Sequence, residues 1–187
     1  MAAAAELVAE IGYERVTVDA IARRAKASKA TMYRNWPTKA ELIADALRRN
    51  ADGGHVLVPD TGTLRTDLLA TVEEIAQSFA RDSGPSLLGL TEAIRQDAVL
   101  RDLVRSQIQA RIREVGALIL DRALARGDDV NSASYDMVLE LAFGWLLTMT
   151  LLNGRMPDVD ERTRLVDEAM LPLLRTASPD CPTEGNV

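Results

Sequence analysis

Apolar side chains recur at helical spacing along almost the whole chain of 187 residues. One helix face is marked by apolar residues at positions i, i+3, i+4 and i+7, namely Val18, Ile21, Ala22 and Ala25. No segment keeps the strict alternation of a strand, and the β-branched patch at 56–58 is too short to build a sheet. The pattern therefore predicts an all-α protein.

Four short helices are expected within residues 1–49. Gly12 is placed to end the first helix, because glycine adopts the left-handed conformation that stops a helix. Thr17 is placed to cap the second helix, and a short third helix spans 29–36. The run 38–41, Thr-Lys-Ala-Glu, is a capping box that opens the fourth. These helices predict a small N-terminal domain.

Glycine and proline divide the chain after this domain. Segment 50–63 holds three Gly and one Pro and predicts a linker. The helices within 64–176 are longer, which predicts a second, larger helical domain. The polar tail 177–187 is expected to be disordered.

Three long helices are expected in the second domain, at 98–126, 132–153 and 159–175, the last capped by Asp158. Many arginines of the first are expected to point outward. Helix 132–153 is apolar almost all round, and such a helix must be covered on all sides. It therefore requires both its own domain and a partner.

The acidic total charge of −6 hides an asymmetry. Residues 1–50 hold nine Lys and Arg against six Asp and Glu, a net charge of +3, whereas the remainder holds thirteen against twenty-two, a net charge of −9. All three lysines lie between 26 and 39, and the only acid within 17–39 is Asp19. A basic head on an acidic body can offer a local surface for phosphate.

Residue types for catalysis, metal binding and membrane insertion are sparse. The only histidine, His55, lies in the linker, and the only cysteine, Cys181, lies in the polar tail, so no disulfide within the chain and no cofactor are expected. The apolar run 141–152 is too short to span a bilayer. These observations favour a cytoplasmic protein with no membrane contact and no enzymatic activity. An all-α enzyme and a protein-binding helical module remain as alternatives.

Two short helices joined by a three-residue turn are a candidate helix-turn-helix, whose second helix enters the major groove of DNA. Here the second helix presents small polar and basic groups: Lys29, Thr31, Tyr33, Arg34 and Asn35. Ser28 is placed to cap it, and the free amides of its first turn attract phosphate. The pattern alone does not distinguish a DNA-binding face from a solvated one.

Residues 6–47, ELVAEIGYERVTVDAIARRAKASKATMYRNWPTKAELIADAL, resemble the N-terminal domain of the TetR family of bacterial repressors. The match is densest at 12–13, 17–22 and 28–39. The resemblance implies binding to double-stranded operator DNA. It implies phosphate contacts by Thr17, Tyr33, Asn35 and Lys39, and a surface close to the base edges formed by Lys29, Ala30, Thr31 and Arg34.

Some positions depart from the family pattern or stay open. Lys26 stands where the family often has glycine, and a left-handed lysine costs about 1 kcal/mol. Ala27 replaces a β-branched core residue. Trp36 is expected to be a core aromatic rather than a DNA contact. For Arg24 and Lys26, contact with the DNA backbone and simple solvation are both open.

Residues 64–175 resemble the regulatory domain of the same family, more loosely. The resemblance implies a homodimer in which helices 132–153 and 159–175 pack against their twins, reading a palindromic operator. It also implies a pocket for a small apolar or weakly polar effector that shifts the protein between conformations. The candidate lining residues are Phe79, Leu90, Ile94, Ile112, Phe143, Trp145, Leu146 and Met149.

Overall fold

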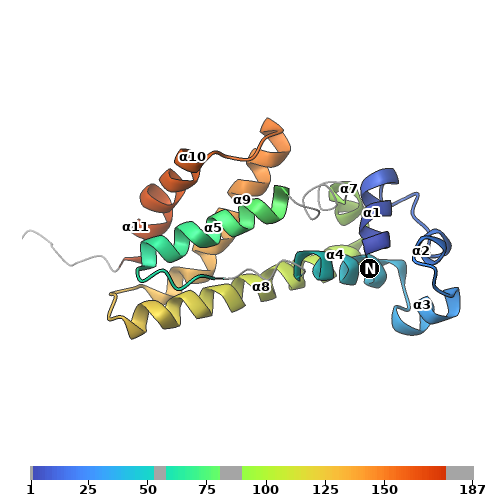
Figure 1. Cartoon of the computed structure of the whole chain (residues 1–187), viewed down its shortest axis with the longest axis horizontal. Coiled ribbons are helices and arrows are strands. Elements are labelled where there is room, and N and C mark those ends of the chain that lie inside the picture. The colour runs from blue at the N-terminus through green and yellow to red at the C-terminus, as the bar shows by residue number, and fades with distance from the viewer. Residues whose placement is uncertain (1, 53–57, 81–89, 176–187) are drawn as a thin grey trace, which may run out of the picture.

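A computed structural model describes residues 2–52, 58–80 and 90–175, and Figure 1 shows that these ranges fold into an elongated array of helices. They contain no strand; one isolated bridge joins Val130 to Arg175. The prediction of an all-α protein is confirmed. His55, Cys181 and the tail 177–187 lie outside the described residues.

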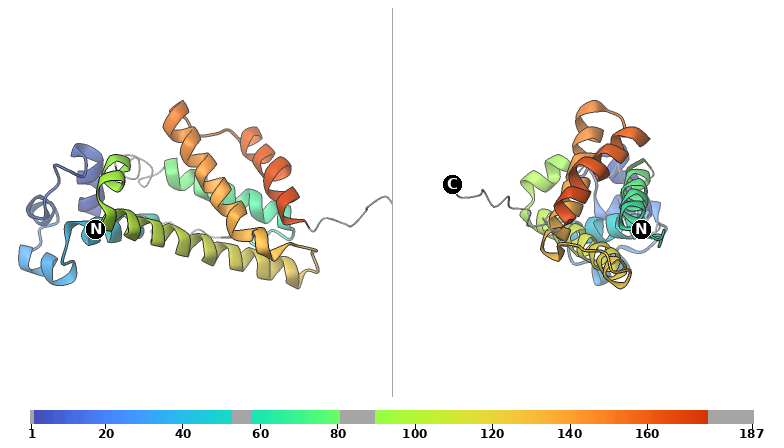
Figure 2. Two further views of the ribbon diagram at one scale, coloured as in Figure 1. Left: turned by 180° about the vertical axis from the view of Figure 1, so that it is seen from behind. Right: turned by 90° about the vertical axis from the view of Figure 1, so that its left-hand side faces the viewer.

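Four helices form the head, which occupies one end of the molecule (Figures 1 and 2). Its boundaries follow the predicted caps: Gly12 has a φ of 77°, and the Thr17 hydroxyl accepts a hydrogen bond from the amide of Ala20. Thr38 and Glu41 form both bonds of the capping box. The helices are α1 (Ala2–Ile11), α2 (Val18–Arg24), α3 (Lys29–Asn35) and α4 (Lys39–Asp52).

The body holds the long helices α5 (Leu64–Ala80), α8 (Ala98–Ala125) and α9 (Tyr135–Asn153), together with the short α7 (Thr91–Gln96). A 3-10 turn (Ser132–Ser134) precedes α9. The helix expected at 159–175 is instead three pieces: α10 (Val159–Arg164), a π segment (Leu165–Met170) and α11 (Leu171–Leu174).

Pro172 explains the π segment. Proline has no amide hydrogen and its ring clashes with the carbonyl four residues earlier, so a regular helix cannot continue past it unchanged. Just before it, the amide of Leu171 donates to the carbonyl of Val166, five residues back, as in a π turn. The predicted start of this segment is confirmed, because Asp158 and Glu161 form a capping box.

Two hydrophobic cores are joined by α8, which runs along most of the molecule (Figure 1). Its C-terminal half supplies Ile119 and Ala123 to the body core. Its start supplies Leu100 and Val104 to the core of the head, together with Leu90 just before α7. The head therefore packs on a helix that belongs equally to the body.

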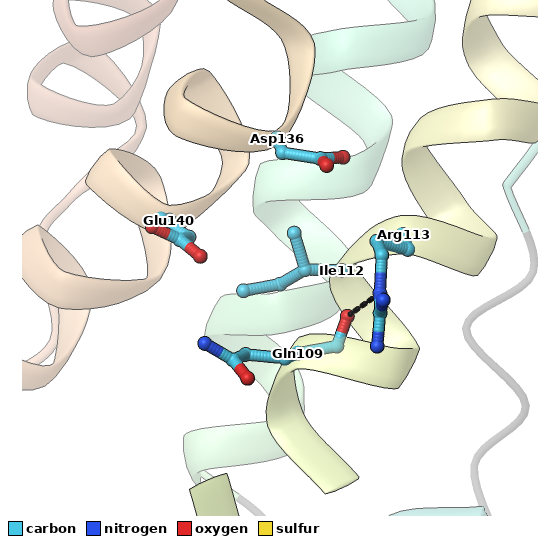
Figure 3. Close-up of a pocket in the computed structure, with 5 residues that line it drawn as sticks. All are labelled: Gln109, Ile112, Arg113, Asp136 and Glu140. Carbon is cyan, nitrogen blue, oxygen red and sulfur yellow. Dashed lines mark hydrogen bonds between the residues drawn. The ribbon is translucent and has the colours of Figure 1, made fainter. Parts of the chain in front are cut away.

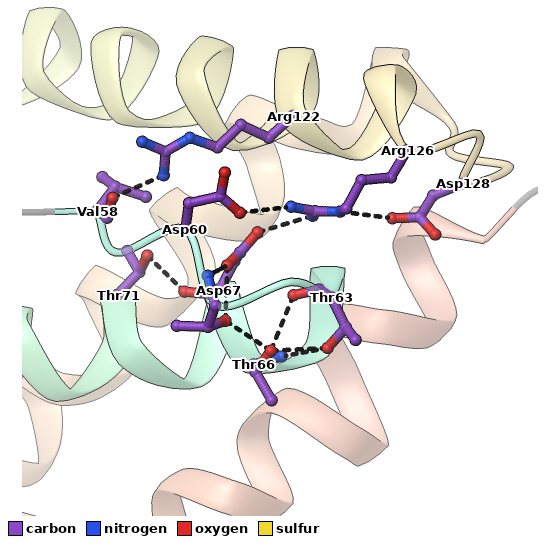
Figure 4. Close-up of polar contacts among 10 residues, drawn as sticks. Val58, Asp60, Thr63, Thr66, Asp67, Thr71, Arg122, Arg126 and Asp128 are labelled. Atoms are coloured by element: carbon purple, nitrogen blue, oxygen red, sulfur yellow. Dashed lines mark hydrogen bonds and ion pairs between the residues drawn. The ribbon is translucent and has the colours of Figure 1, made fainter.

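A buried carboxylate at the far end of α8 ties the body together (Figure 4). Asp67 of α5 is fully buried and accepts hydrogen bonds from the amide and hydroxyl of Thr61 at 2.8 and 2.7 Å. The Arg126 guanidinium binds it at 2.7 Å and also binds Asp60 at 3.0 Å. Burial raises the pKa of Asp67, but these partners outweigh burial and hold its pKa below the usual range.

This network also occupies two arginines at the end of the long helix. The arginines at its C-terminal end do not all point outward. Arg126 turns toward Asp67, and Arg122 donates to the carbonyl of Val58 at 2.6 Å. Both side chains bind acceptors near the end of the linker, where a buried acceptor without a hydrogen-bond donor would be unfavourable.

Apolar residues cover both faces of α9. One face is buried in the body core through Val138, Leu139, Ala142 and Leu146. Gly116 of α8 lies where the two helices approach, since an added Cβ there would stand 3.2 Å from the Tyr135 side chain. By length and composition α9 could cross a membrane, but packing on one whole face identifies it as a core helix.

A polar contact joins head and body beside the shared core. The Tyr13 hydroxyl donates to Asp97 at 2.9 Å, and Asp97 also caps α8 by accepting from the amide of Leu100. The Lys39 ammonium donates to the Tyr13 carbonyl and lies 4.0 Å from the centre of its ring. The Leu100 amide and the Tyr13 hydroxyl together hold the pKa of Asp97 below its usual range, although burial opposes them.

The variant Tyr13→Phe tests this contact. We expect it to lower the free energy of unfolding at neutral pH by about 1 kcal/mol, because a hydrogen bond to a carboxylate is lost. A lowered carboxyl pKa stabilises the fold above the unfolded-state pKa, and this contribution disappears as pH falls through the folded-state pKa. The difference from wild type in denaturant unfolding should therefore shrink in acid.

Tyr33→Phe is the matched control, because Tyr33 is 45% exposed and its hydroxyl forms no hydrogen bond within the described residues. It should leave the unfolding free energy unchanged at every pH. A Tyr13→Phe difference that stays constant into acid would show that the Asp97 contact is not its cause.

Candidate DNA-binding interface

Helices α2 and α3 lie at the free end of the head, farthest from the body (Figures 1 and 2). Their inner sides are held by the head core: Val18, Ile21 and Ala22 of α2 are buried, as is Met32, the single buried residue of α3. A short helix fixed by one buried side and a neighbouring helix leaves the rest of its surface open to a ligand.

The turn between α2 and α3 has the conformation that the departure at Lys26 implied. Lys26 has a φ of 51°, in the left-handed region, and the amide of Ala27 donates back to the carbonyl of Ala22 at 2.9 Å. This closes α2 and redirects the chain into α3. The turn therefore forms with lysine in place of glycine, and the strain of the left-handed residue remains.

The outer face of α3 carries the predicted polar residues. Lys29, Ala30, Tyr33, Arg34 and Asn35 are exposed, as are Thr17 and Ser28, while Thr31 is half-buried. The Ser28 hydroxyl caps α3 by accepting from the amide of Thr31 at 3.0 Å, and the two hydroxyls lie 2.8 Å apart. The structure thus brings these residues together on one protruding surface.

Two basic residues near this surface hold intramolecular partners that the sequence analysis did not foresee. The Lys29 ammonium lies 2.8 Å from Asp19 of α2. Arg24, whose role was open, forms a two-pronged pair with Glu10 of α1, both bonds at 2.8 Å. The signal in the sequence was weak, because partners separated by a turn cannot be assigned from spacing.

Trp36 lies at the end of α3 and is half-buried against the head core. Its indole N–H donates to Asp45 of α4 at 3.0 Å, which connects α3 to the next helix. Burial raises the pKa of Asp45, but Arg48, the indole and Arg49 together hold it below its usual range. Packing and this hydrogen bond account for the tryptophan without a contact to DNA.

The comparisons with known families match both parts of the chain. The family of bacterial regulatory proteins, tetR family, matches residues 1–46, and the tetracyclin repressor-like C-terminal domain matches residues 58–169. The chain belongs to the TetR family. It is a helix-turn-helix transcriptional regulator, and this family consists of transcriptional regulators rather than enzymes.

Similar proteins span nearly the whole chain. The HTH-type transcriptional regulator Rv1556 of Mycobacterium tuberculosis H37Rv is 36% identical over 174 residues, which covers 93% of this chain and 85% of the relative. The DNA-binding transcriptional repressor TetR of Mycobacteroides abscessus is 34% identical, covering 94% and 92%. The crystal structure of the TetR family regulator SCO0332 superposes with a TM-score of 0.68 at 28% identity, covering 90% and 92%.

The eight residues predicted to line an effector pocket lie in different parts of the structure. Leu90 and Ile94 pack with the core of the head. Phe79 and Phe143 contact each other in the body, with ring centres 5.4 Å apart. The others lie in or against the body core or on α9: Ile112, Trp145, Leu146 and Met149. The split arises because α7 and the start of α8 pack on the head.

A surface hollow with a volume of about 220 Å³ lies between α8 and α9 (Figure 3). Its lining is Gln109, Ile112, Arg113, Asp136 and Glu140, so it shares only Ile112 with the predicted pocket. Arg113 is held by the carbonyl of Gln109 at 3.3 Å rather than by either acid. The hollow is charged, unlike the apolar lining that the sequence analysis expected.

The strain at the turn of this TetR-family head is testable with Lys26→Gly. Glycine adopts a positive φ without a side-chain clash, so we expect the free energy of unfolding to rise by about 1 kcal/mol. Thermal or urea unfolding without DNA measures this. Ala25→Gly is the control: Ala25 has a φ of −78°, and glycine there should destabilise. An equal loss in both variants would contradict a strained turn.

Proposed function

We propose that this chain is a ligand-responsive cytoplasmic repressor that binds a palindromic DNA operator as a homodimer. The proposal rests above all on one observation: α3 protrudes from the head with only Met32 fully buried and with its polar residues exposed. The name of the M. abscessus relative, a DNA-binding transcriptional repressor, supports repression rather than activation.

In this proposal α3 enters the major groove, where its side chains meet base edges. Lys29, Ala30, Thr31 and Arg34 form the surface closest to the bases. The surrounding contacts to phosphate position the helix. They come from the hydroxyls of Thr17, Ser28 and Tyr33, the side-chain amide of Asn35 and the ammonium of Lys39. The basic charge of the head supports this assignment, because phosphate contacts require cations on one side of the molecule.

Lys39 makes the least direct of these contacts. Its ammonium is bound to the Tyr13 carbonyl at 3.1 Å and lies over the Tyr13 ring. A lysine carries three donors, so one bond to a carbonyl leaves two for a phosphate. Lys39 can then bridge DNA to the Tyr13–Asp97 contact that joins head and body.

The variant Arg34→Ala tests DNA binding. Because a good base contact is worth about 1–3 kcal/mol, we expect operator affinity to fall about 5- to 150-fold. Gel-shift titration against duplexes from the intergenic region next to the gene measures the affinity, repeated at several salt concentrations. Wild-type binding should weaken steeply with salt, because phosphate contacts release counterions.

Arg105→Ala is the matched control, because Arg105 is an exposed arginine of α8 that pairs with Asp102 and lies outside both α3 and the proposed dimer interface. It should bind like wild type. Wild-type affinity that barely changes with salt, or an equal loss in both variants, would contradict recognition by α3 and favour an enzyme or a protein-binding module.

The proposed dimer uses the uncovered side of α9. Met137, Leu141, Leu151 and Leu152 recur on this side at helical spacing and are exposed, at 42% for Leu141 and 80% for Leu152. On the segment that follows, Val159 and Leu173 are exposed as well. An apolar helix surface of this extent is expected to be buried against a partner. A second copy offers the same apolar surface, related by a two-fold axis.

The dimer is testable with Leu141→Glu. A carboxylate in an apolar helix–helix interface is desolvated without a partner, so we expect the protein to shift from dimer to monomer in sedimentation velocity. Leu118→Glu on α8 is the control, because Leu118 is also 42% exposed but lies outside the proposed interface. If both variants sediment like wild type, α9 does not form the interface.

The proposed effector is small and acts by shifting a conformational equilibrium, which requires it to bind one state of the body more tightly than the other. The shared helix α8 supports such coupling, because a movement in the body core reaches the head core through one rigid element. We expect an apolar or weakly polar effector for the body core.

A further inference from the structure

Asp19 is an acid at the start of α2, where a carboxylate interacts favourably with the helix dipole. It lies in the first turn of α2, on the exposed surface that also carries Thr17 and Lys29. A carboxylate on a surface that approaches DNA repels phosphate. An ion pair between exposed side chains contributes only about 0–1 kcal/mol to folding. We therefore consider what this ion pair does to the partner side chain.

That partner is Lys29, the first residue of α3. Both carboxylate oxygens of Asp19 bind the Lys29 ammonium, at 2.8 and 3.0 Å, although each side chain is more than half exposed (56% and 57%). The side-chain bond from Asp19 raises the pKa of Lys29. The ammonium also lies 5.9 Å from the centre of the Tyr33 ring. The lysine is thus held at the N-terminal end of α3, where a helix in the major groove meets the bases.

The two bonds change what Lys29 can do on DNA. A free lysine is a flexible point charge that follows any phosphate, and ordering it upon binding is entropically unfavourable. With its ammonium within 3.0 Å of both Asp19 oxygens, Lys29 keeps fewer donors and fewer directions for a second acceptor. The Asp19 carboxylate also weakens the attraction of this surface for DNA phosphates, whatever the base sequence.

We propose that Asp19 is a positioning residue for operator discrimination, which aims Lys29 at a base edge and keeps it from phosphates of unrelated DNA. This inference rests on the proposed function, because it assumes that α3 reads DNA. Asp19 makes specific binding tighter relative to non-specific binding, and it does so through Lys29.

Four proteins test the proposal: wild type, Asp19→Asn, Lys29→Ala and the double variant. Random-sequence duplexes selected on wild-type protein supply an operator, and a scrambled duplex of equal length supplies non-specific DNA. Affinities for both are measured over a range of salt. Asp102→Asn is the control for loss of one negative charge, since Asp102 is an exposed acid of α8 paired with Arg105.

We expect Asp19→Asn to bind the scrambled duplex more tightly and to lose about 10-fold in the ratio of operator to scrambled affinity, the scale of one base contact. Its salt dependence on scrambled DNA should steepen by about one released ion, because Lys29 then reaches a phosphate. In the Lys29→Ala background the same change should leave the ratio unaltered.

Three results would contradict the proposal, and each has a different meaning. If wild-type protein selects no sequence, the proposed function fails, and the inference fails with it. If wild type selects an operator but Asp19→Asn strengthens both duplexes equally, Asp19 acts as a bulk charge only and the inference alone is overturned. A loss of ratio that persists without Lys29 would show that Asp19 contacts DNA itself, which also overturns it.

Discussion

The whole arrangement depends on burial along one helix. With 28 residues, α8 is about 42 Å long, and it is the element that the two hydrophobic cores share. Leu100 at one end and Ile119 toward the other are both fully buried. Because a packed helix is stiff, the head cannot turn on the body without disturbing one of these cores. The position of α3 and the packing of the body are therefore linked through apolar contacts.

Polar contacts fix the two ends of this shared helix. At its start, Asp97 caps the helix and receives the hydroxyl of Tyr13 from the head. At its end, Arg126 neutralises the buried Asp67. Each of these carboxylates is more acidic than usual, so both contacts are complete at neutral pH and weaken in acid. A carboxylate also binds a cationic side chain at α3, where Asp19 binds Lys29, but there both side chains are exposed.

Two exposed surfaces of this TetR-family regulator are not used in packing the single chain. The polar face of α3 at the free end of the head is suited to DNA, and the exposed apolar side of α9 in the body is suited to a second copy. Neither surface is needed for the fold of a single chain, since α3 is anchored by Met32 and α9 by its buried side. The fold therefore leaves both free to bind.

Local signals in the sequence determined the helices of the head, their caps at Thr17 and Ser28, the left-handed turn at Lys26 and the exposure of α3, because each depends on residues within a few positions. The family was identifiable for the same reason. Tertiary structure alone decided that Leu90 and Ile94 pack on the head, that Arg126 turns inward, and that Lys29 is bound by Asp19. Such contacts join separate helices, and their geometry depends on how the helices pack rather than on any local pattern.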